Sequence, residues 1–379
     1  MQLYRENREG ALEFARAIPR RRDFKAEEKI AGGVAKKQLS FTYPLGDGRI
    51  RCEDAIEYGD EIYRVKEAPA KGMFGSVVAE QDTGALCGNA VREFKAQGLT
   101  LTQCVSAAVE GSGWGYENVS ADDAGTRNIM ESGTNSMELL ERVAEVFWVE
   151  ISFSAKKKKI YLHNRIGGGQ TRFLKGFNLQ SLEEKTDTHG FYTRIYPIGK
   201  DGLTVGSVNA GKDYLDNTQY SREVRAFVWE DTNYTDAYKL KEAAQKKLDG
   251  LSVPKTTYTA QVLDMANIQD GYGDYAFSLG DEAWLTDPDI GVDARERIVR
   301  ITRYPDAPHK NTVELSNRGT GFADMQKKLL AAAESMESVS NGKIIIGKKV
   351  EGLTAQQVEG LELYYTSPIT NLEIDEICS

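Results

Sequence analysis

The chain has 379 residues and a net charge of −9 at pH 7, from 57 Asp and Glu against 48 Lys and Arg. This length is enough for a sizeable core and for about two to four domains. The acidic balance disfavours a non-specific grip on nucleic acid and binding to an anionic membrane surface.

Cysteine and hydropathy patterns exclude further classes of protein. The four cysteines (Cys52, Cys87, Cys104 and Cys378) form no CxxC pair, which argues against a zinc ribbon or a disulfide scaffold and predicts reduced thiols. No apolar stretch approaches the roughly 20 residues that a membrane helix needs, and the first residues, MQLYRENREG, lack a signal-peptide core. We therefore expect no membrane insertion, and folding in the cytosol.

Strand signals separated by turn residues dominate the chain. In residues 39–43 (LSFTY), apolar side chains alternate with hydroxyl-bearing ones, so one face of a strand is expected to pack and the other to face solvent. The same period of two recurs in residues 149–153, 258–262 and around 298–304. These four segments are predicted to be half-buried strands.

A helix is predicted just before the strand at 149–153. Asn135 followed by Glu138 resembles an N-cap with a reciprocal acid, and apolar side chains then share one face as far as Phe147. After that strand, the lysines 156–159 precede an apolar segment at 160–162, which predicts a hairpin with the lysines at its tip. A lysine run could grip an anion, but a solvated tip that discourages edge pairing is the favoured interpretation.

Residues 192–204 read YTRIYPIGKDGLT, and a second Gly-Lys-Asp occurs at 211–213. A phosphate-binding P-loop needs GxxxxGK followed by Ser or Thr. Asp follows both lysines here, so its carboxylate would repel a phosphate, and the upstream glycine spacing is absent. Gly-Lys-Asp-Gly at 199–202 lies between an aromatic, β-branched run and residues 203–205, and we interpret it as the turn of a hairpin.

Three further helices are predicted towards the C-terminus. Apolar residues at helical spacing span 237–248, and Gly250 closes this helix. A similar pattern spans 322–336. Thr354 and Gln357 form a capping box for a short last helix.

Residues suited to catalysis are sparse. The three histidines, His163, His189 and His309, have no zinc-binding spacing, and no GxSxG serine-hydrolase motif is present. Asp187 and His189 are the one pair that could act as an acid and a base in catalysis, although a turn is the favoured interpretation. No cofactor, metal ligand or catalytic residue is predicted.

Several segments of the chain resemble, in colinear order over about residues 35–320, the phage tail hub family, also called prophage endopeptidase tail or tail-associated lysin. The segments are 39–43, 61–65, 99–114, 177–214, 279–281, 297–299, 302–304 and 313–317, and TRIYPIGKDGLT is the strongest of them. The residues that carry the family pattern, in a structural role, are Thr193, Arg194, Tyr196, Pro197, Gly199, Gly202, Gly280 and Asp281. The segment at 20–23 (RRRD), Gly32 and Gly33 have no match in that pattern.

The resemblance implies an α+β, β-rich fold with two small β-barrels, similar to the central hub of contractile-tail baseplates. The implied domains are a first barrel from 1–96 and 188–235, an inserted α/β domain at 97–187, a second barrel at 253–317, and a small helical α/β domain from 236–252 and 318–379.

The resemblance further implies a homotrimeric ring at the tail tip or baseplate of a phage or phage-tail-like particle, made in the cytoplasm of a bacterial host. The ring would join the tail tube to the baseplate and gate the channel, and part of the acidic excess would line the channel wall so that DNA does not stick. Implied partners are the distal tail or tail tube protein, the tape measure protein and receptor-binding or other baseplate proteins, with no sequence-specific nucleic acid.

Two other functions stay open. The family's name and the pair of Asp187 and His189 suggest a tail-associated cell-wall hydrolase. However, only about sixty residues follow the hub-like region, too few for an ordinary catalytic domain, so no enzymatic activity is expected. The 18 tyrosines and 4 tryptophans could stack on sugars in a carbohydrate-binding module.

Overall fold

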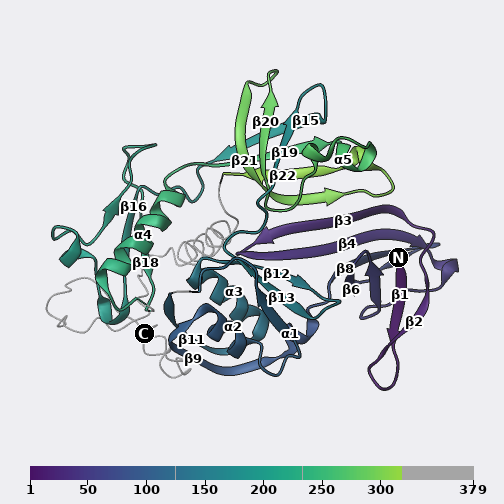
Figure 1. The fold of residues 1–379 in the computed structure, drawn as a ribbon, viewed down its shortest axis with the longest axis horizontal. Helices are drawn as coiled ribbons and strands as arrows, with labels where there is room; N and C mark the ends of the chain where they lie inside the picture. Colours follow the sequence, from purple (N-terminus) through teal and green to yellow (C-terminus); the bar gives the residue numbers. More distant parts are fainter. Residues whose placement is uncertain (124, 233, 318–379) are drawn as a thin grey trace, which may run out of the picture. The chain divides into compact units, whose positions relative to one another are not determined.

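The computed structural model describes residues 1–123, 125–232 and 234–317. In these residues strands dominate and helices are few (Figure 1), so the β-rich class predicted from the sequence is confirmed. The helices predicted at 322–336 and after Thr354 lie outside the described residues.

The first group of elements is an antiparallel sheet at the N-terminus. Its elements are β1 (Gln2–Glu6), β2 (Leu12–Ala17), β3 (Arg22–Ala31), β4 (Val34–Pro44), η1 (Leu45–Asp47), β5 (Ala55–Tyr58), β6 (Glu61–Glu67), β7 (Ala70–Lys71) and β8 (Phe74–Gln81). Successive neighbours in the sheet are β3, β4, β8, β6, β5, β1 and β2. The predicted strand at 39–43 lies in β4, where Leu39, Phe41 and Tyr43 are buried in one core as the alternation requires.

The second group is an α/β lobe. Its elements are α1 (Gly84–Gly88), β9 (Ala90–Thr100), α2 (Leu101–Ala108), β10 (Gly115–Asn118), β11 (Thr126–Asn135), α3 (Ser136–Phe147), β12 (Glu150–Ser154) and β13 (Lys159–His163). The helices α2 and α3 lie between the β9–β11 ribbon and the β12–β13 hairpin (Figure 1), and their apolar faces form the largest buried cluster.

Local predictions in this lobe are largely confirmed. The Asn135 side chain accepts a hydrogen bond from the Glu138 backbone N–H at 3.0 Å and caps α3. The Glu138 carboxylate accepts from the Thr134 hydroxyl at 2.8 Å, so the predicted reciprocal contact is wrong. The β12–β13 hairpin is formed, with Lys158 at φ +48° in its turn.

The third group is a six-stranded sheet. Its elements are β14 (Gln170–Leu174), β15 (Leu179–Asp187), β19 (Lys255–Val262), α5 (Met265–Ile268), η4 (Gly273–Tyr275), β20 (Glu282–Asp287), β21 (Val292–Arg303), η5 (Pro308–Lys310) and β22 (Thr312–Ser316). The strand order is β14, β20, β21, β22, β19, β15, and the sheet encloses an apolar cluster to which Ile30 of β3 and Ala35 of β4 also belong. β21 also pairs with β3 of the first sheet.

The fourth group is a three-stranded sheet with one long helix. Its elements are β16 (Arg194–Ile198), η2 (Lys200–Gly202), η3 (Gly206–Val208), β17 (Leu215–Asp216), β18 (Ala226–Glu230) and α4 (Ala237–Leu251). β16 lies between β17 and β18. The predicted end of α4 at Gly250 is one residue short, because Leu251 is fully buried and the helix continues to include it.

Strand pairing differs from the implied domains at two places. Residues 170–187, which the insert was expected to contain, form β14 and β15 and pair with the third group. Residues 194–230 pair only with one another among the described strands, and not with residues 1–96. The alternating pattern of a strand identifies its buried face but not its neighbour, because pairing depends on contacts distant in sequence.

Candidate functional site

The eight family-pattern residues fall into two separate places. Thr193, Arg194, Tyr196, Pro197, Gly199 and Gly202 lie in or beside β16, whereas Gly280 and Asp281 lie just before β20. The two places differ in geometry and can therefore have different roles.

Thr193 and Arg194 connect the start of β16 to its two neighbouring strands. Thr193 bonds to the segment just before β18, and Arg194 bonds to β17. The Thr193 hydroxyl donates to the Glu223 carbonyl at 2.6 Å and accepts from the Arg225 N–H at 2.9 Å. The Arg194 guanidinium makes two hydrogen bonds to the Asp216 carboxylate, at 2.7 and 2.9 Å, and these raise the pKa of Arg194 above its ordinary value. The start of β16 is therefore held by hydrogen bonds that only the side chains of Thr193 and Arg194 supply.

Pro197 fits β16 because of its position in the ladder. The Arg194 N–H donates to the Arg225 carbonyl, and the Ile198 carbonyl accepts from the Asp231 N–H, so even-numbered residues of β16 bond to β18. The backbone nitrogen of Pro197, which carries no hydrogen, therefore faces away from β18. On that side β17 pairs only with Arg194 and Ile195. No ladder hydrogen bond is lost.

The segment Gly199 to Gly202 is a turn, as interpreted from the sequence. The Gly199 N–H donates to the Leu203 carbonyl at 2.7 Å, and Gly202 has φ +78°. A Cβ at Gly199 would lie 2.6 Å from the Tyr234 carbonyl oxygen. The expected second strand at 203–205 is wrong: no strand forms there, and Val205 is fully buried.

Gly280 and Asp281 meet the glycine-rich loop 166–169 at very close range. A Cβ on Gly280 would overlap the Ile166 carbonyl oxygen, and Gly280 also has φ +90°. The Asp281 carboxylate accepts hydrogen bonds from the backbone N–H groups of Gly169 at 2.9 Å and of Gly168 at 3.2 Å. Glycine is required here both for the backbone conformation and for the approach of the two chains.

A buried ion pair completes this second place. The guanidinium of Arg297, on β21, makes two hydrogen bonds of 2.6 Å to the carboxylate of Glu150, on β12, and only 8% of Arg297 is exposed. Arg297 also donates to the carbonyls of Ile166 at 2.8 Å and Gly280 at 3.1 Å. Glu150 in turn accepts from the Ile166 N–H at 2.6 Å.

We call this set of residues the junction: Glu150, Ile166, Gly167, Gly168, Gly169, Gly280, Asp281 and Arg297. It links β12 of the α/β lobe to β20 and β21 of the third group through the ion pair, through hydrogen bonds and through the close approach of Gly280 to Ile166. A carboxylate and a guanidinium in bidentate contact are a strong pair when further hydrogen bonds support them, and here Arg297 also donates to two carbonyls.

Sequence reasoning found only part of the junction. Gly280 and Asp281 came from the family pattern, and Gly167 to Gly169 were visible only as a glycine-rich loop. Glu150 was missed, and Arg297 appeared only within the family segment 297–299, because each stands in an alternating strand where a charged residue normally faces solvent. The available signal was that Arg297 shares its strand face with the apolar Val299.

Candidate catalytic residues do not assemble into a site. The Asp187 carboxylate accepts a hydrogen bond from the His189 backbone N–H at 3.2 Å, which is a turn contact. His163 lies 3.0 Å from the Ser152 hydroxyl, and burial lowers the pKa of its imidazole. In the part of the chain that the structure describes, no group of three or more His, Cys, Asp or Glu is placed to hold a metal ion.

No helix among the described residues is both long and apolar enough to cross a membrane.

The fold is that of prophage tail proteins. A prophage tail protein, gp18, from Listeria monocytogenes EGD-e has 15% identity and a TM-score of 0.60, with 88% of this chain and 99% of that chain covered. The 43 kDa tail protein of prophage MuSo2 from Shewanella oneidensis has 14% identity and a TM-score of 0.60, covering 85% and 100%. A tail protein from Neisseria meningitidis MC58 has 10% identity and a TM-score of 0.60, covering 82% and 96%.

Residues 168–326 match the family model described as Prophage endopeptidase tail. The resemblance to this family, predicted from the sequence, is thus confirmed. The matched region contains both places occupied by the family-pattern residues. A search of curated proteins found no match.

Proposed function

We propose that the protein is a structural hub at the tail tip or baseplate of a phage or phage-tail-like particle. The observation that carries this proposal is the combination of a family match at 168–326 with a tail-protein fold that covers more than four fifths of the chain. On this proposal three copies form a ring that joins the tail tube to the baseplate and gates its channel.

The junction fits a structural role in which two groups of elements must stay together. It connects two groups of elements by a bidentate ion pair and by backbone contacts that no side chain separates. Such a connection resists bending between the α/β lobe and the third group, because any opening would leave two buried charges without partners. A tail component has to transmit force without coming apart at such points.

We also propose a revised division of the chain into domains. The first barrel-like unit comprises β1 to β8, and the second comprises β14 and β15 with β19 to β22. Most of the apolar side chains of each sheet form one cluster, and the cluster of the second unit also includes Ile30 and Ala35 of the first. Residues 84–163 form the insert, and residues 191–252 form a fourth unit.

The proposed role is not enzymatic, and the proposed partners are other tail proteins. These are the distal tail or tail tube protein, the tape measure protein and receptor-binding or other baseplate proteins, together with two further copies of the chain. The channel wall of the ring would carry part of the net charge of −9 and so repel DNA.

Locating the protein in an assembled particle tests this function. A particle-forming strain would carry a tagged copy of the chain, and gold label against the tag would be viewed by electron microscopy. Label at one end of the tail is expected. Label along the tail shaft, on the capsid or only in the unassembled fraction contradicts a hub. Peptidoglycan incubated with the purified protein should stay intact, with His189→Ala as the matched variant.

A further inference from the structure

A pocket of about 820 Å³ lies beside α2, in the α/β lobe. One side of it is the outer flank of this helix, and the other side is the segment 110–116, which follows α2 and runs into β10. Small-molecule sites have volumes of roughly 300–1,000 Å³. The pocket shares no residue with the junction or with β16, so the roles described above leave it unused.

Glycines keep the second side of the pocket open. Residues 111–116 read GSGWGY, so glycine alternates with other residues along this side. A Cβ at Gly113 or at Gly115 would have no neighbour within 4 Å. The space that a side chain would fill at these two positions is therefore available to a ligand.

Local contacts fix the shape of the same segment. The Ser112 hydroxyl donates to the Val109 carbonyl at 2.6 Å and accepts from the Trp114 backbone N–H at 3.2 Å. The Trp114 ring packs edge to face with Phe153 of β12, with 6.0 Å between the ring centroids. The pocket is therefore formed before a ligand binds, which lowers the entropic cost of binding.

Three polar side chains in the pocket keep bonding capacity to spare. The Gln103 carbonyl oxygen accepts from the Thr100 N–H at 2.9 Å in the cap of α2, which leaves the two amide hydrogens of Gln103 without an acceptor among the described residues. The Ser106 hydroxyl and the Glu110 carboxylate also bond to no side chain or backbone group in the described part of the chain. These groups offer both donors and acceptors to a ligand.

Two aromatic side chains lie among these polar groups. Trp114 is only 6% exposed, and its indole N–H makes no hydrogen bond to a described residue although protein atoms do not enclose it fully. Tyr116 is partly buried, and its hydroxyl likewise has no partner among residues 1–123, 125–232 and 234–317. An indole that is buried except at an unpaired N–H can donate to a bound molecule while its ring gives apolar contact.

We propose that this α2 pocket, defined as Gln103, Ser106, Glu110, Trp114, Gly115 and Tyr116, binds an uncharged sugar. The C–H face of a sugar ring packs on aromatic side chains, and its hydroxyls both donate and accept hydrogen bonds. The Glu110 carboxylate would accept from a hydroxyl, and the Gln103 amide and the Trp114 indole would donate to others. The site does not rest on the proposed hub function.

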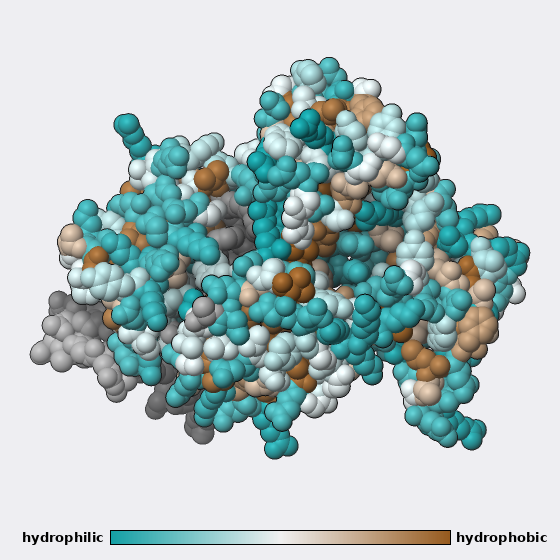
Figure 2. Space-filling view, viewed as in Figure 1, coloured by the Kyte–Doolittle hydropathy of each residue, from teal (hydrophilic) through white to brown (hydrophobic). Residues whose placement is uncertain are grey.

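The charge of the pocket and the character of the surface favour such a ligand. None of the residues that line the pocket is Lys, Arg or His, and the Glu110 carboxylate would repel an anion. On the face of the α/β lobe that Figure 2 shows, hydrophobic residues are scattered among hydrophilic ones. A broad apolar patch of the kind that marks a protein-binding surface is not seen on that face.

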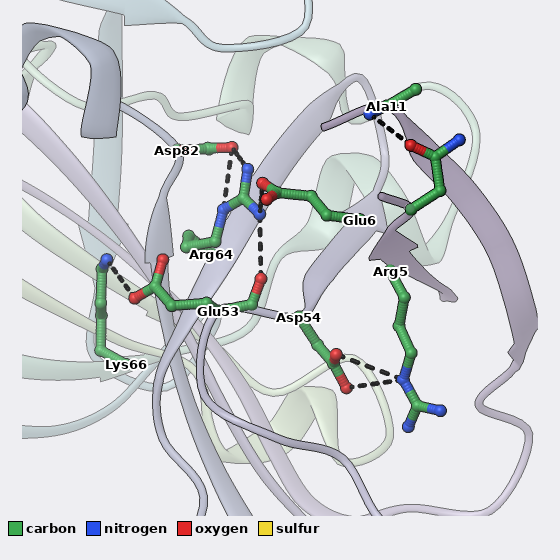
Figure 3. A network of polar contacts seen from close by, with 9 residues as sticks. Arg5, Glu6, Ala11, Glu53, Asp54, Arg64, Lys66 and Asp82 are labelled. Atoms are coloured by element: carbon green, nitrogen blue, oxygen red, sulfur yellow. Dashed lines mark hydrogen bonds and ion pairs between the residues drawn. The ribbon is translucent and has the colours of Figure 1, made fainter. Parts of the chain in front are cut away.

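The charged cluster at the base of the N-terminal hairpin, made of β1 and β2, is a contrast (Figure 3). The Arg64 guanidinium bonds to the carboxylates of Glu6 at 2.9 Å and Asp82 at 2.7 Å, and to the Glu53 carbonyl at 2.9 Å. Lys66 donates to the Glu53 carboxylate at 2.9 Å. These charged groups satisfy one another, whereas the polar groups of the α2 pocket are left for a ligand.

The test is saturation-transfer difference NMR on the full chain. The uncharged probes are glucose, galactose, mannose and N-acetylglucosamine, and the charged probes are glucuronate and glucosamine. Gly115→Leu fills the pocket, at a strand position that has no positive φ and open space for a side chain. Gly46→Leu, in η1, is the matched control with the same two properties. Unchanged melting temperatures establish that both variants are folded.

We expect saturable binding of at least one uncharged sugar, weaker by at least about tenfold in Gly115→Leu and unchanged in Gly46→Leu. Ser106→Ala, which removes one exposed hydroxyl from a helix, should bind about threefold more weakly. This variant tests the pocket even if Gly115→Leu does not fold. No saturable binding of any uncharged probe, or undiminished binding to both pocket variants, overturns the proposal.

Two further arms identify other occupants. Tighter binding of glucuronate or glucosamine than of every uncharged sugar, lost in Gly115→Leu, would assign the pocket to a charged ligand. A native mass that falls in Gly115→Leu but not in Gly46→Leu would assign it to a second copy of the chain. Either result overturns the proposal.

Discussion

The junction and the N-terminal hairpin of β1 and β2 both contain arginine, in opposite surroundings. At the junction, Arg297 is buried, and its guanidinium bonds to Glu150 and to two carbonyls. In the turn of the hairpin, Arg8 is exposed and has no acidic partner among the described residues. Burial makes the first arrangement a stabilising contact that fails if one member is lost, whereas an exposed side chain without an ion pair contributes little to stability.

The largest expected effect is at the buried ion pair. Arg297→Met should lower the free energy of unfolding by about 3–5 kcal/mol, because the Glu150 carboxylate would then be buried without a cation. The measurement is the urea midpoint of the purified protein. Arg300→Met is the matched control on the same strand, where the partly exposed pair with Glu314 should be worth about 1 kcal/mol or less. Equal losses in the two variants would contradict a special role for the junction.

The next largest loss of stability is expected at Gly280. It distinguishes the cost of the close contact at the junction from the cost of the backbone conformation. Gly280 at φ +90° and Gly271 at φ +88° have nearly the same backbone angle, but only Gly280 has a neighbour in the space of a Cβ. Gly280→Ala should destabilise by more than about 2 kcal/mol and Gly271→Ala by about 1 kcal/mol. Thermal melting of both variants decides this, and a larger loss at Gly271 would refute the argument from contact.

A pH effect is expected from Glu296, which is adjacent to Arg297 but has no cation within ion-pair distance in the described part of the chain. Burial raises the pKa of its carboxyl from 4.5 to about 7. Its contribution to stability is therefore fully present below pH 4.5 and is lost as the pH rises through about 7.

The variant Glu296→Gln has no carboxyl group to ionise at this position, so it should not lose stability there as the pH rises. Its melting temperature should match that of the unaltered protein near pH 4.5 and exceed it at pH 8. The exposed Glu183→Gln on β15 is the control and should follow the unaltered protein at both pH values. A Glu296→Gln protein that gains nothing at pH 8 would show that the carboxylate is stabilised when charged.

The smallest expected effect is at Arg8, in the turn of the N-terminal hairpin. Arg8→Glu should change the free energy of unfolding by less than about 0.5 kcal/mol, because the side chain is exposed and makes no ion pair. A chemical denaturation curve beside that of Arg297→Met measures the contrast directly. A loss of several kcal/mol from Arg8→Glu would mean that this arginine stabilises the fold and would remove the distinction between the two regions.

Local features of the fold were predictable from the sequence, but long-range pairing was not. Asn135 identified the start of α3, and the lysines at 156–159 identified the β12–β13 turn, because caps and turns depend on neighbouring residues. The pairing of β14 with β20 could not be predicted, since nothing in residues 170–174 specifies a partner more than a hundred positions away. The same limit hid the contact between Glu150 and Arg297.

The family pattern supplied what local rules could not. It identified Gly280 and Asp281 as structurally important, although neither residue lies in a regular element. The close approach of Gly280 to Ile166 gives that importance a physical reason. For Thr193 the reason is a buried hydroxyl that both donates and accepts a hydrogen bond.

The measurement that tests the hub proposal most directly is native mass by mass photometry over a concentration series. A species of three times the 42.1 kDa chain mass that persists on dilution is expected. A chain that stays monomeric at every concentration, both alone and with the tail tube protein added, would contradict the proposed ring.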